Sequence, residues 1–174
     1  MNKGENIKKL IFLSIISCCL YAENLKISVA PVNNEVYKKE CGSCHFAYPA
    51  GLLPSNAWNK MMENLSNHFG DDASVDEETF KTLSKYLNDN SAEKNMNFKR
   101  SKKIVESLVP NEIPDAISTM PYIKRKHKEI RKDLITQKEV KGLFNCTACH
   151  KNAQKGVFSD EDVDIPNYGK WDKK

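Results

Sequence analysis

Long apolar runs are nearly absent from this sequence. The one that exists, residues 10–22, follows three lysines. A basic start followed by an apolar run too short to span a bilayer is typical of an export signal. We therefore predict a signal peptide over residues 1–22 and a mature chain in the periplasm. Lipidation at Cys18, which would anchor the chain to the membrane, is the alternative.

Cysteine is scarce, and none is left over for conventional disulfides. Of the six cysteines, two lie in the predicted signal peptide. The other four belong to two Cys-x-x-Cys-His motifs, made of Cys41, Cys44 and His45 and of Cys146, Cys149 and His150. An exported chain meets an oxidising compartment, so these thiols must be paired or chemically consumed.

Alternation of apolar and polar residues, the mark of a half-buried β-strand, is also missing. Helical periodicity predicts helices over residues 33–45, 55–70, 74–89, 121–135 and 136–150, and a short helix or turn over residues 102–110. Ser55 is the expected cap of the second helix, and Pro121 is expected near the first position of the fifth. Capping boxes are predicted at Ser74 and at Thr136. The polar stretch 88–101 has no apolar period, which predicts a linker.

Three chemistries use a Cys-x-x-Cys pair. A zinc ribbon separates its two pairs by about 15–20 residues, far fewer than here. A thioredoxin-like dithiol needs a strand-and-helix setting, which this sequence lacks. Covalent attachment of c-type haem fits best, because cysteines three apart share a helical face and the next histidine can reach the iron. Two haem c groups are therefore predicted, with zinc and dithiol chemistry as the alternatives.

The four histidines match the needs of two haems. His45 and His150 are the predicted proximal ligands. His68 and His127 remain as distal candidates, and each lies on the apolar stripe of a predicted helix. Methionine is the rival distal ligand, with candidates at Met61, Met62, Met96 and Met120. Met120, just before a proline, is the strongest rival to His127.

Charge is divided along the chain. Residues 93–158 carry 15 basic and 7 acidic side chains, whereas residues 23–92 carry 6 basic and 10 acidic ones. The basic run "KRKHKEIRK" around His127 would by itself indicate a solvated face or a nucleic-acid patch. Its lysines and arginines point away from the apolar stripe, so we interpret it as a docking surface for an acidic protein.

The motifs together resemble one known family. The segment "YKKECGSCHFAYPAGLLP", with the helix that follows it, and the segment "NCTACHKNAQKGVFSDEDVDIP" are similar to the dihaem cytochrome c family of periplasmic electron carriers. The resemblance implies bis-histidine, low-spin haems, ligated by His45 and His68 in the first lobe and by His127 and His150 in the second. It also implies a membrane b-type cytochrome as redox partner.

We therefore predict an all-α fold of two small helical c-type-cytochrome-like lobes, residues 23–95 and 96–174, each built around one covalently attached haem. Two imidazoles on each iron would leave no open coordination site, which favours electron transfer over catalysis. The prediction is an electron carrier, not an enzyme, with redox proteins as partners and without nucleic acid or a small-molecule substrate. A small peroxidase-like dihaem enzyme and a gas or redox sensor are the alternatives.

Overall fold

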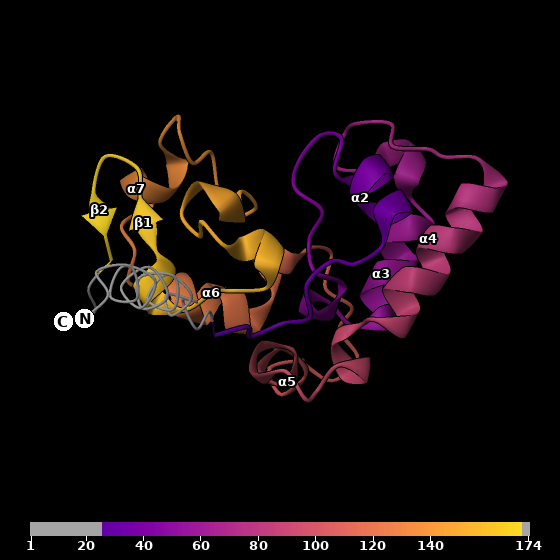
Figure 1. Cartoon of the computed structure of the whole chain (residues 1–174), viewed down its shortest axis with the longest axis horizontal. Coiled ribbons are helices and arrows are strands. Elements are labelled where there is room, and N and C mark those ends of the chain that lie inside the picture. The colour runs from indigo at the N-terminus through magenta and orange to yellow at the C-terminus, as the bar shows by residue number, and fades with distance from the viewer. Residues whose placement is uncertain (1–25, 172–174) are drawn as a thin grey trace, which may run out of the picture.

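Helices dominate the computed structural model, which describes residues 26–171. The described helices are α2 (Glu35–Cys41), α3 (Ser55–Met62), α4 (Glu77–Asp89), α5 (Lys99–Val105), α6 (Pro121–His127) and α7 (Lys132–Thr136). In Figure 1, α2, α3 and α4 form one group, α6 and α7 belong to a second, and α5 lies below them. The predicted all-α class is confirmed.

The predicted signal peptide, residues 1–22, lies outside the described residues. Within residues 26–171, no helix is both long and apolar enough to cross a membrane.

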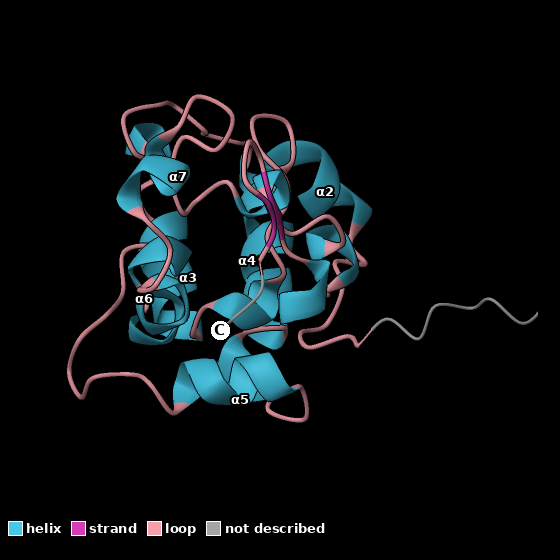
Figure 2. Cartoon of the chain, turned by 90° about the vertical axis from the view of Figure 1, so that its left-hand side faces the viewer, coloured by secondary structure: helices cyan, strands magenta, loops and turns pink. Residues whose placement is uncertain are grey.

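Near the C-terminus a small hairpin replaces the expected loop. β1 (Asp164–Ile165) pairs antiparallel with β2 (Gly169–Lys170), and these are the two strands drawn in magenta in Figure 2. The turn between them uses Asn167 at φ 60° and Gly169 at φ 97°. Ile165 is buried in this hairpin against Leu134 of α7. Each strand has two residues, too few for alternation to be visible in the sequence.

Helix α2 leads directly into the first cysteine motif, as predicted. The side chain of Asn34 accepts a hydrogen bond from the backbone N–H of Tyr37 at 2.8 Å and caps the helix. The helix ends at Cys41. The buried Tyr37 hydroxyl donates to the Tyr48 carbonyl at 2.8 Å, so the chain after the motif is held against α2.

The predicted helix over residues 55–70 is too long. α3 ends at Met62, and His68 lies in a turn instead of on a helical face. Ser55 is also the first helical residue and not the cap. The run from Asn64 is rich in asparagine and serine, whose side chains compete for backbone hydrogen bonds. The Asn64 side chain indeed donates to the Asn67 carbonyl at 3.2 Å.

Both predicted capping boxes are wrong. Asp76, and not Ser74, caps α4, because its carboxylate accepts from the Thr79 backbone N–H at 2.9 Å. A carboxylate at this position also interacts favourably with the helix dipole. Thr136 is the last residue of α7, and the chain reaches the second motif through turns that include Lys141 at φ 66°.

The predicted helix over residues 121–135 is divided in two. Pro121 does occupy the start of α6, which ends at His127. The chain then turns before α7 begins, and Leu134 becomes buried against Val163 and Ile165. Packing of this apolar cluster overrides the continuous helical period.

The polar stretch 88–101 is packed rather than loose. Ser91 and Ala92 are fully buried, and the Ala92 N–H donates to the Leu53 carbonyl at 2.9 Å. The Arg100 N–H donates to the Ser28 carbonyl at 2.8 Å. Backbone hydrogen bonds therefore hold this segment against both neighbouring parts of the chain, although its composition indicated a linker.

The extended N-terminal segment lies against the far end of the chain. The Ser28 N–H donates to the Gly156 carbonyl at 2.9 Å, and Val29 is fully buried. Gly156 has φ 74°, and a Cβ there would lie 2.1 Å from the Val29 carbonyl oxygen. Only glycine fits this close approach. One apolar cluster consequently includes residues from Val29 to Phe158.

Candidate haem sites

The first motif lies at the surface, just beyond α2. Cys41 is half-buried at the end of the helix, whereas Cys44 and His45 are exposed. One ring nitrogen of His45, Nδ1, is hydrogen-bonded to the Phe46 carbonyl at 2.9 Å. This bond orients the imidazole and leaves Nε2 for another partner.

His68 faces His45 across a gap. Their ring centroids are 6.3 Å apart and their planes differ by 32°. His68 is held by two backbone hydrogen bonds with Asp71, of 2.7 and 3.2 Å. Phe69 follows at φ 56°, so a tight turn and not a helix positions the ring. Met61 and His68 line the same cavity.

The second motif repeats this arrangement. Cys146 begins a short 3-10 turn, and the His150 N–H donates to the Cys146 carbonyl at 2.8 Å. His127, the last residue of α6, has its Nδ1 hydrogen-bonded to the Ile123 carbonyl at 2.8 Å. The centroids of His127 and His150 are 6.2 Å apart, and their planes differ by 82°.

Both ring separations equal what a shared metal ion requires. Two imidazole–metal bonds of about 2.0 Å, plus about 1.1 Å from each bonding nitrogen to its ring centre, give a centroid separation of about 6.2 Å. A direct N–H···N hydrogen bond between the two rings would bring their centroids to about 5 Å. The structure thus brings together the predicted pairs: His45 with His68, and His127 with His150.

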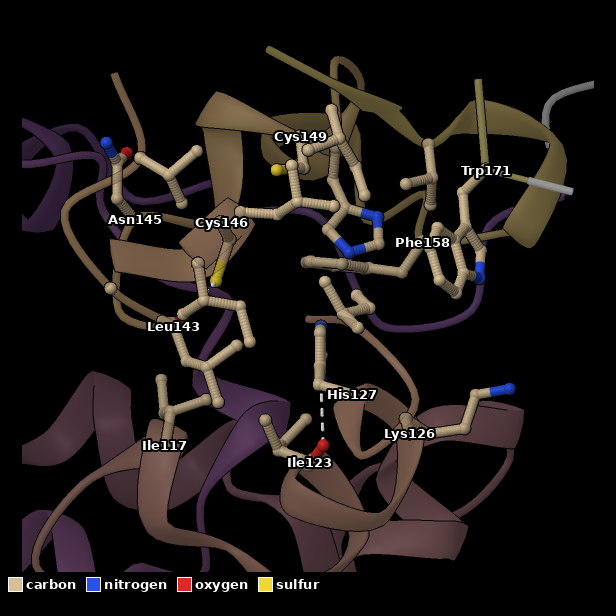
Figure 3. Close-up of a pocket in the computed structure, with 18 of the residues that line it drawn as sticks. Ile117, Ile123, Lys126, His127, Leu143, Asn145, Cys146, Cys149, Phe158 and Trp171 are labelled. Atoms are coloured by element: carbon tan, nitrogen blue, oxygen red, sulfur yellow. Dashed lines mark hydrogen bonds between the residues drawn. The ribbon is translucent and has the colours of Figure 1, made fainter. Parts of the chain in front are cut away.

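An apolar cavity lies between the histidines of the second pair. Figure 3 shows the His127 ring rising from α6 towards the segment that carries Cys146 and Cys149. The volume of this cavity is about 70 Å³. Its wall is mostly apolar and includes Leu52 from the first half of the chain and Trp171 from the end. A wall of this kind, largely apolar with a few polar groups, is typical of a ligand or cofactor site.

The histidines are electrostatically suited to bind a metal. Burial lowers the pKa of His68 and of His127 below the usual value. For His150, burial and the nearby His127 and Arg100 lower the pKa to about 4. The buried Nδ1 of His150 also has no hydrogen-bond partner within the described residues. Neutral imidazoles, one incompletely satisfied, are the state that metal ligation needs.

The cysteines are poorly suited to redox catalysis. Burial raises the pKa of the free thiol of Cys41 to about 11, and that of Cys146 to about 11. Reactive Cys-x-x-Cys pairs instead have lowered pKa values, because the thiolate is the nucleophile. Among residues 26–171, no three His, Cys, Asp or Glu side chains converge as a zinc site would require.

The methionine candidates differ in position. Met120 is fully buried as the N-cap of α6, in the apolar core rather than in the wall of the second cavity. Met62 is likewise a core residue, and Met96 is exposed. Met61 alone among the four lines a cavity beside a candidate histidine.

Sequence reasoning missed Arg100. It lies in a basic stretch that was interpreted as part of a linker, yet the structure buries it in the wall of the second cavity. Its partners, Ser28, Tyr122 and Phe158, come from three distant segments. No local pattern brings these segments together, so no signal in the sequence could have identified it.

Comparison with known proteins identifies the family of this chain. Residues 37–158 match the family described as dihaem cytochrome c. A dihaem c-type cytochrome of Shewanella baltica OS155 is 36% identical, with 80% of this chain and 98% of that chain covered at a TM-score of 0.67. A dihaem cytochrome c from Rhodobacter sphaeroides is also 36% identical, with 75% of this chain and 100% of that chain covered at a TM-score of 0.66. No curated protein sequence matches. The family match spans more than half of the chain and includes both cysteine motifs, so the chain belongs to the dihaem cytochrome c family.

Proposed function

We propose that this chain is a periplasmic electron carrier whose two covalently attached haems are each held between two histidines. His45 and His68 would ligate the first haem, and His127 and His150 the second. The observation that carries the proposal is the pair of ring separations, 6.3 and 6.2 Å, between histidines from different segments. The predicted lobes, residues 23–95 and 96–174, would each hold one of these pairs.

The side chains hold and tune the cofactor rather than perform chemistry. When bound, each haem supplies a one-electron iron couple. The cysteines would anchor the haem, while backbone carbonyls at Phe46 and Ile123 orient His45 and His127. Apolar walls limit the access of water. If two histidines hold each haem, no coordination site would remain for a substrate, which would favour a carrier over a peroxidase-like enzyme or a gas sensor.

The two haems are expected to give different electron paramagnetic resonance spectra. Nearly parallel imidazole planes separate two iron d orbitals in energy, whereas perpendicular planes leave them almost equal and increase the anisotropy of the signal. With planes at 32° and 82°, the first haem is expected to give a rhombic low-spin signal and the second a strongly anisotropic one. A spectrum of the oxidised protein checks this expectation. A far-red methionine-to-iron absorption band would contradict it at one of the haems.

The natural electron donor in this proposal is a membrane b-type cytochrome, as the resemblance to the family implies. The docking surface would run from the basic face of α6 over the turn after it to the start of α7, where Lys124, Lys128 and Lys132 are exposed. Such a surface accelerates encounter with an acidic partner at low ionic strength.

Reversal of these three charges should slow electron transfer. We expect Lys124→Glu, Lys128→Glu and Lys132→Glu together to lower the second-order rate with an acidic donor such as flavodoxin hydroquinone by about tenfold at low salt. Stopped-flow measurement over a range of ionic strengths checks this, and the salt dependence should become flatter.

The matched control changes the same number of charges elsewhere. Lys39→Glu, Lys81→Glu and Lys85→Glu alter exposed lysines of the first group of helices. If this triple variant slows the reaction equally, net charge and not a docking surface controls the rate.

A further inference from the structure

Arg100 is the one charged side chain that is buried within residues 26–171. It is 9% exposed and lies on α5. Its guanidinium lies in the wall of the cavity that contains His127 and His150. Arginine keeps its charge in proteins, so a positive charge is fixed beside the second haem site.

All three hydrogen-bond partners of this guanidinium are neutral. Nη2 donates to the Phe158 carbonyl at 2.6 Å, Nε to the Ser28 hydroxyl at 3.3 Å, and Nη1 to the Tyr122 hydroxyl at 3.5 Å. The charge also lies over the rings of Tyr122 and Phe158, at 5.6 and 5.0 Å from their centroids. Asp160, in the same cavity wall, forms an ion pair with Lys126 at 3.7 Å.

A purely structural role does not account for the charge. A neutral amide could meet the carbonyl and the two hydroxyls, and it would avoid the cost of burying a cation. Aromatic faces compensate only part of that cost. Asp160 acts electrostatically on this charge from the same cavity wall, but no described carboxylate forms an ion pair with Arg100.

We propose that Arg100 is the counter-charge for a carboxylate of the second haem and makes this haem the first to be reduced. The proposal rests on the proposed ligation by His127 and His150. A nearby positive charge stabilises the iron state with one fewer positive charge, which is Fe(II). The step is the gain of one electron by Fe(III), supplied by a redox partner protein, without a proton.

The first site has no equivalent residue among those described. Lys60 in the cavity beside His68 is exposed and pairs with Asp115 at 2.6 Å. Cys44 and His45 are themselves exposed, whereas His150 is partly buried. Solvent screens charges at the first site and stabilises Fe(III) there. The Arg100 charge beside the second haem and the solvent at the first site therefore both give the second haem the higher reduction potential.

The test is a spectroelectrochemical titration of Arg100→Gln, with Arg100→Lys and Arg125→Gln as companions. Arg125 is an exposed arginine that also lies over the Tyr122 ring, at 5.4 Å, so it is a matched control. We expect Arg100→Gln to lower the reduced-to-oxidised ratio of the second haem about tenfold at a fixed potential, about 59 mV for one electron. Arg100→Lys should keep the midpoint potential of the second haem close to the wild-type value, and Arg125→Gln should leave this potential unchanged.

The second haem is identified in a His68→Ala background, where it alone should remain low-spin. If Arg100→Gln keeps two haems and a wild-type melting curve but moves neither midpoint, Arg100 is only a structural clamp and the proposal is wrong. If Arg100→Gln does not fold, the order in which the two haems of the wild-type protein are reduced decides. The low-spin signal that survives in His68→Ala identifies the second haem. In the wild-type protein this signal must be the first to disappear on reduction, and the reverse order overturns the proposal. Two low-spin haems in His68→Ala would instead contradict the proposed ligation.

Discussion

His68→Ala should convert the first haem from low-spin to high-spin while the haem remains attached through Cys41 and Cys44. The distal imidazole supplies half of the axial ligand field, and its loss leaves a five-coordinate or water-bound iron. Absorption and electron paramagnetic resonance spectra of the oxidised protein measure the change. About half of the total haem is expected to become high-spin, because the second pair of histidines is untouched.

Two further measurements separate ligation from general disruption of the turn. Added imidazole should restore the low-spin spectrum of His68→Ala, because the site faces an open cavity that also borders exposed Phe69. Met61→Leu should leave the spectrum unchanged. If His68→Ala remains low-spin and Met61→Leu does not, methionine is the sixth ligand of the first haem.

The cysteine motifs could be recognised from the sequence because their geometry is local. Cysteines three residues apart and an adjacent histidine are positioned by a single turn of chain, whatever surrounds them. The start of α6 at Pro121 and the course of α2 into Cys41 were predictable for the same reason.

The setting of the distal histidines depends on tertiary structure, and here the predictions were mixed. His68 was expected on a helix and lies in a turn, yet it still faces His45. The helical period therefore does not position His68, because polar side chains after Met62 end the helix early. His127 ends its helix, because the chain must turn there to bury Leu134.

Features that join distant segments could not be predicted from the sequence. The contact of Val29 with Gly156 and the burial of Arg100 both bring the two ends of the chain together. Packing and backbone hydrogen bonds stabilise these contacts. They join segments that lie more than a hundred residues apart, or that come from three separate elements. Composition alone made residues 88–101 resemble a linker, since polarity reports exposure only on average.

The second haem offers a direct comparison between a predicted ligand and its rival. His127→Ala should make this haem high-spin, because His127 faces His150 across the cavity and its Nδ1 is already occupied by the Ile123 carbonyl. Met120→Ala should leave the haem low-spin but lower the free energy of unfolding by about 2–5 kcal/mol, because it opens a hole in the packed core. Spin state and thermal or denaturant unfolding, measured on both variants, distinguish these effects.

The opposite pattern would reassign the ligand. If Met120→Ala lost the low-spin signal while His127→Ala kept it, the Met120 sulfur would have to leave a core position in which it is fully buried. That movement would unpack the start of α6, where Met120 is the N-cap. The haem-loaded protein would then need an α6 different from the one described. A Met120→Leu variant, which fills the same volume without a metal-binding sulfur, provides the control: with histidine ligation it should keep both the low-spin spectrum and most of the stability.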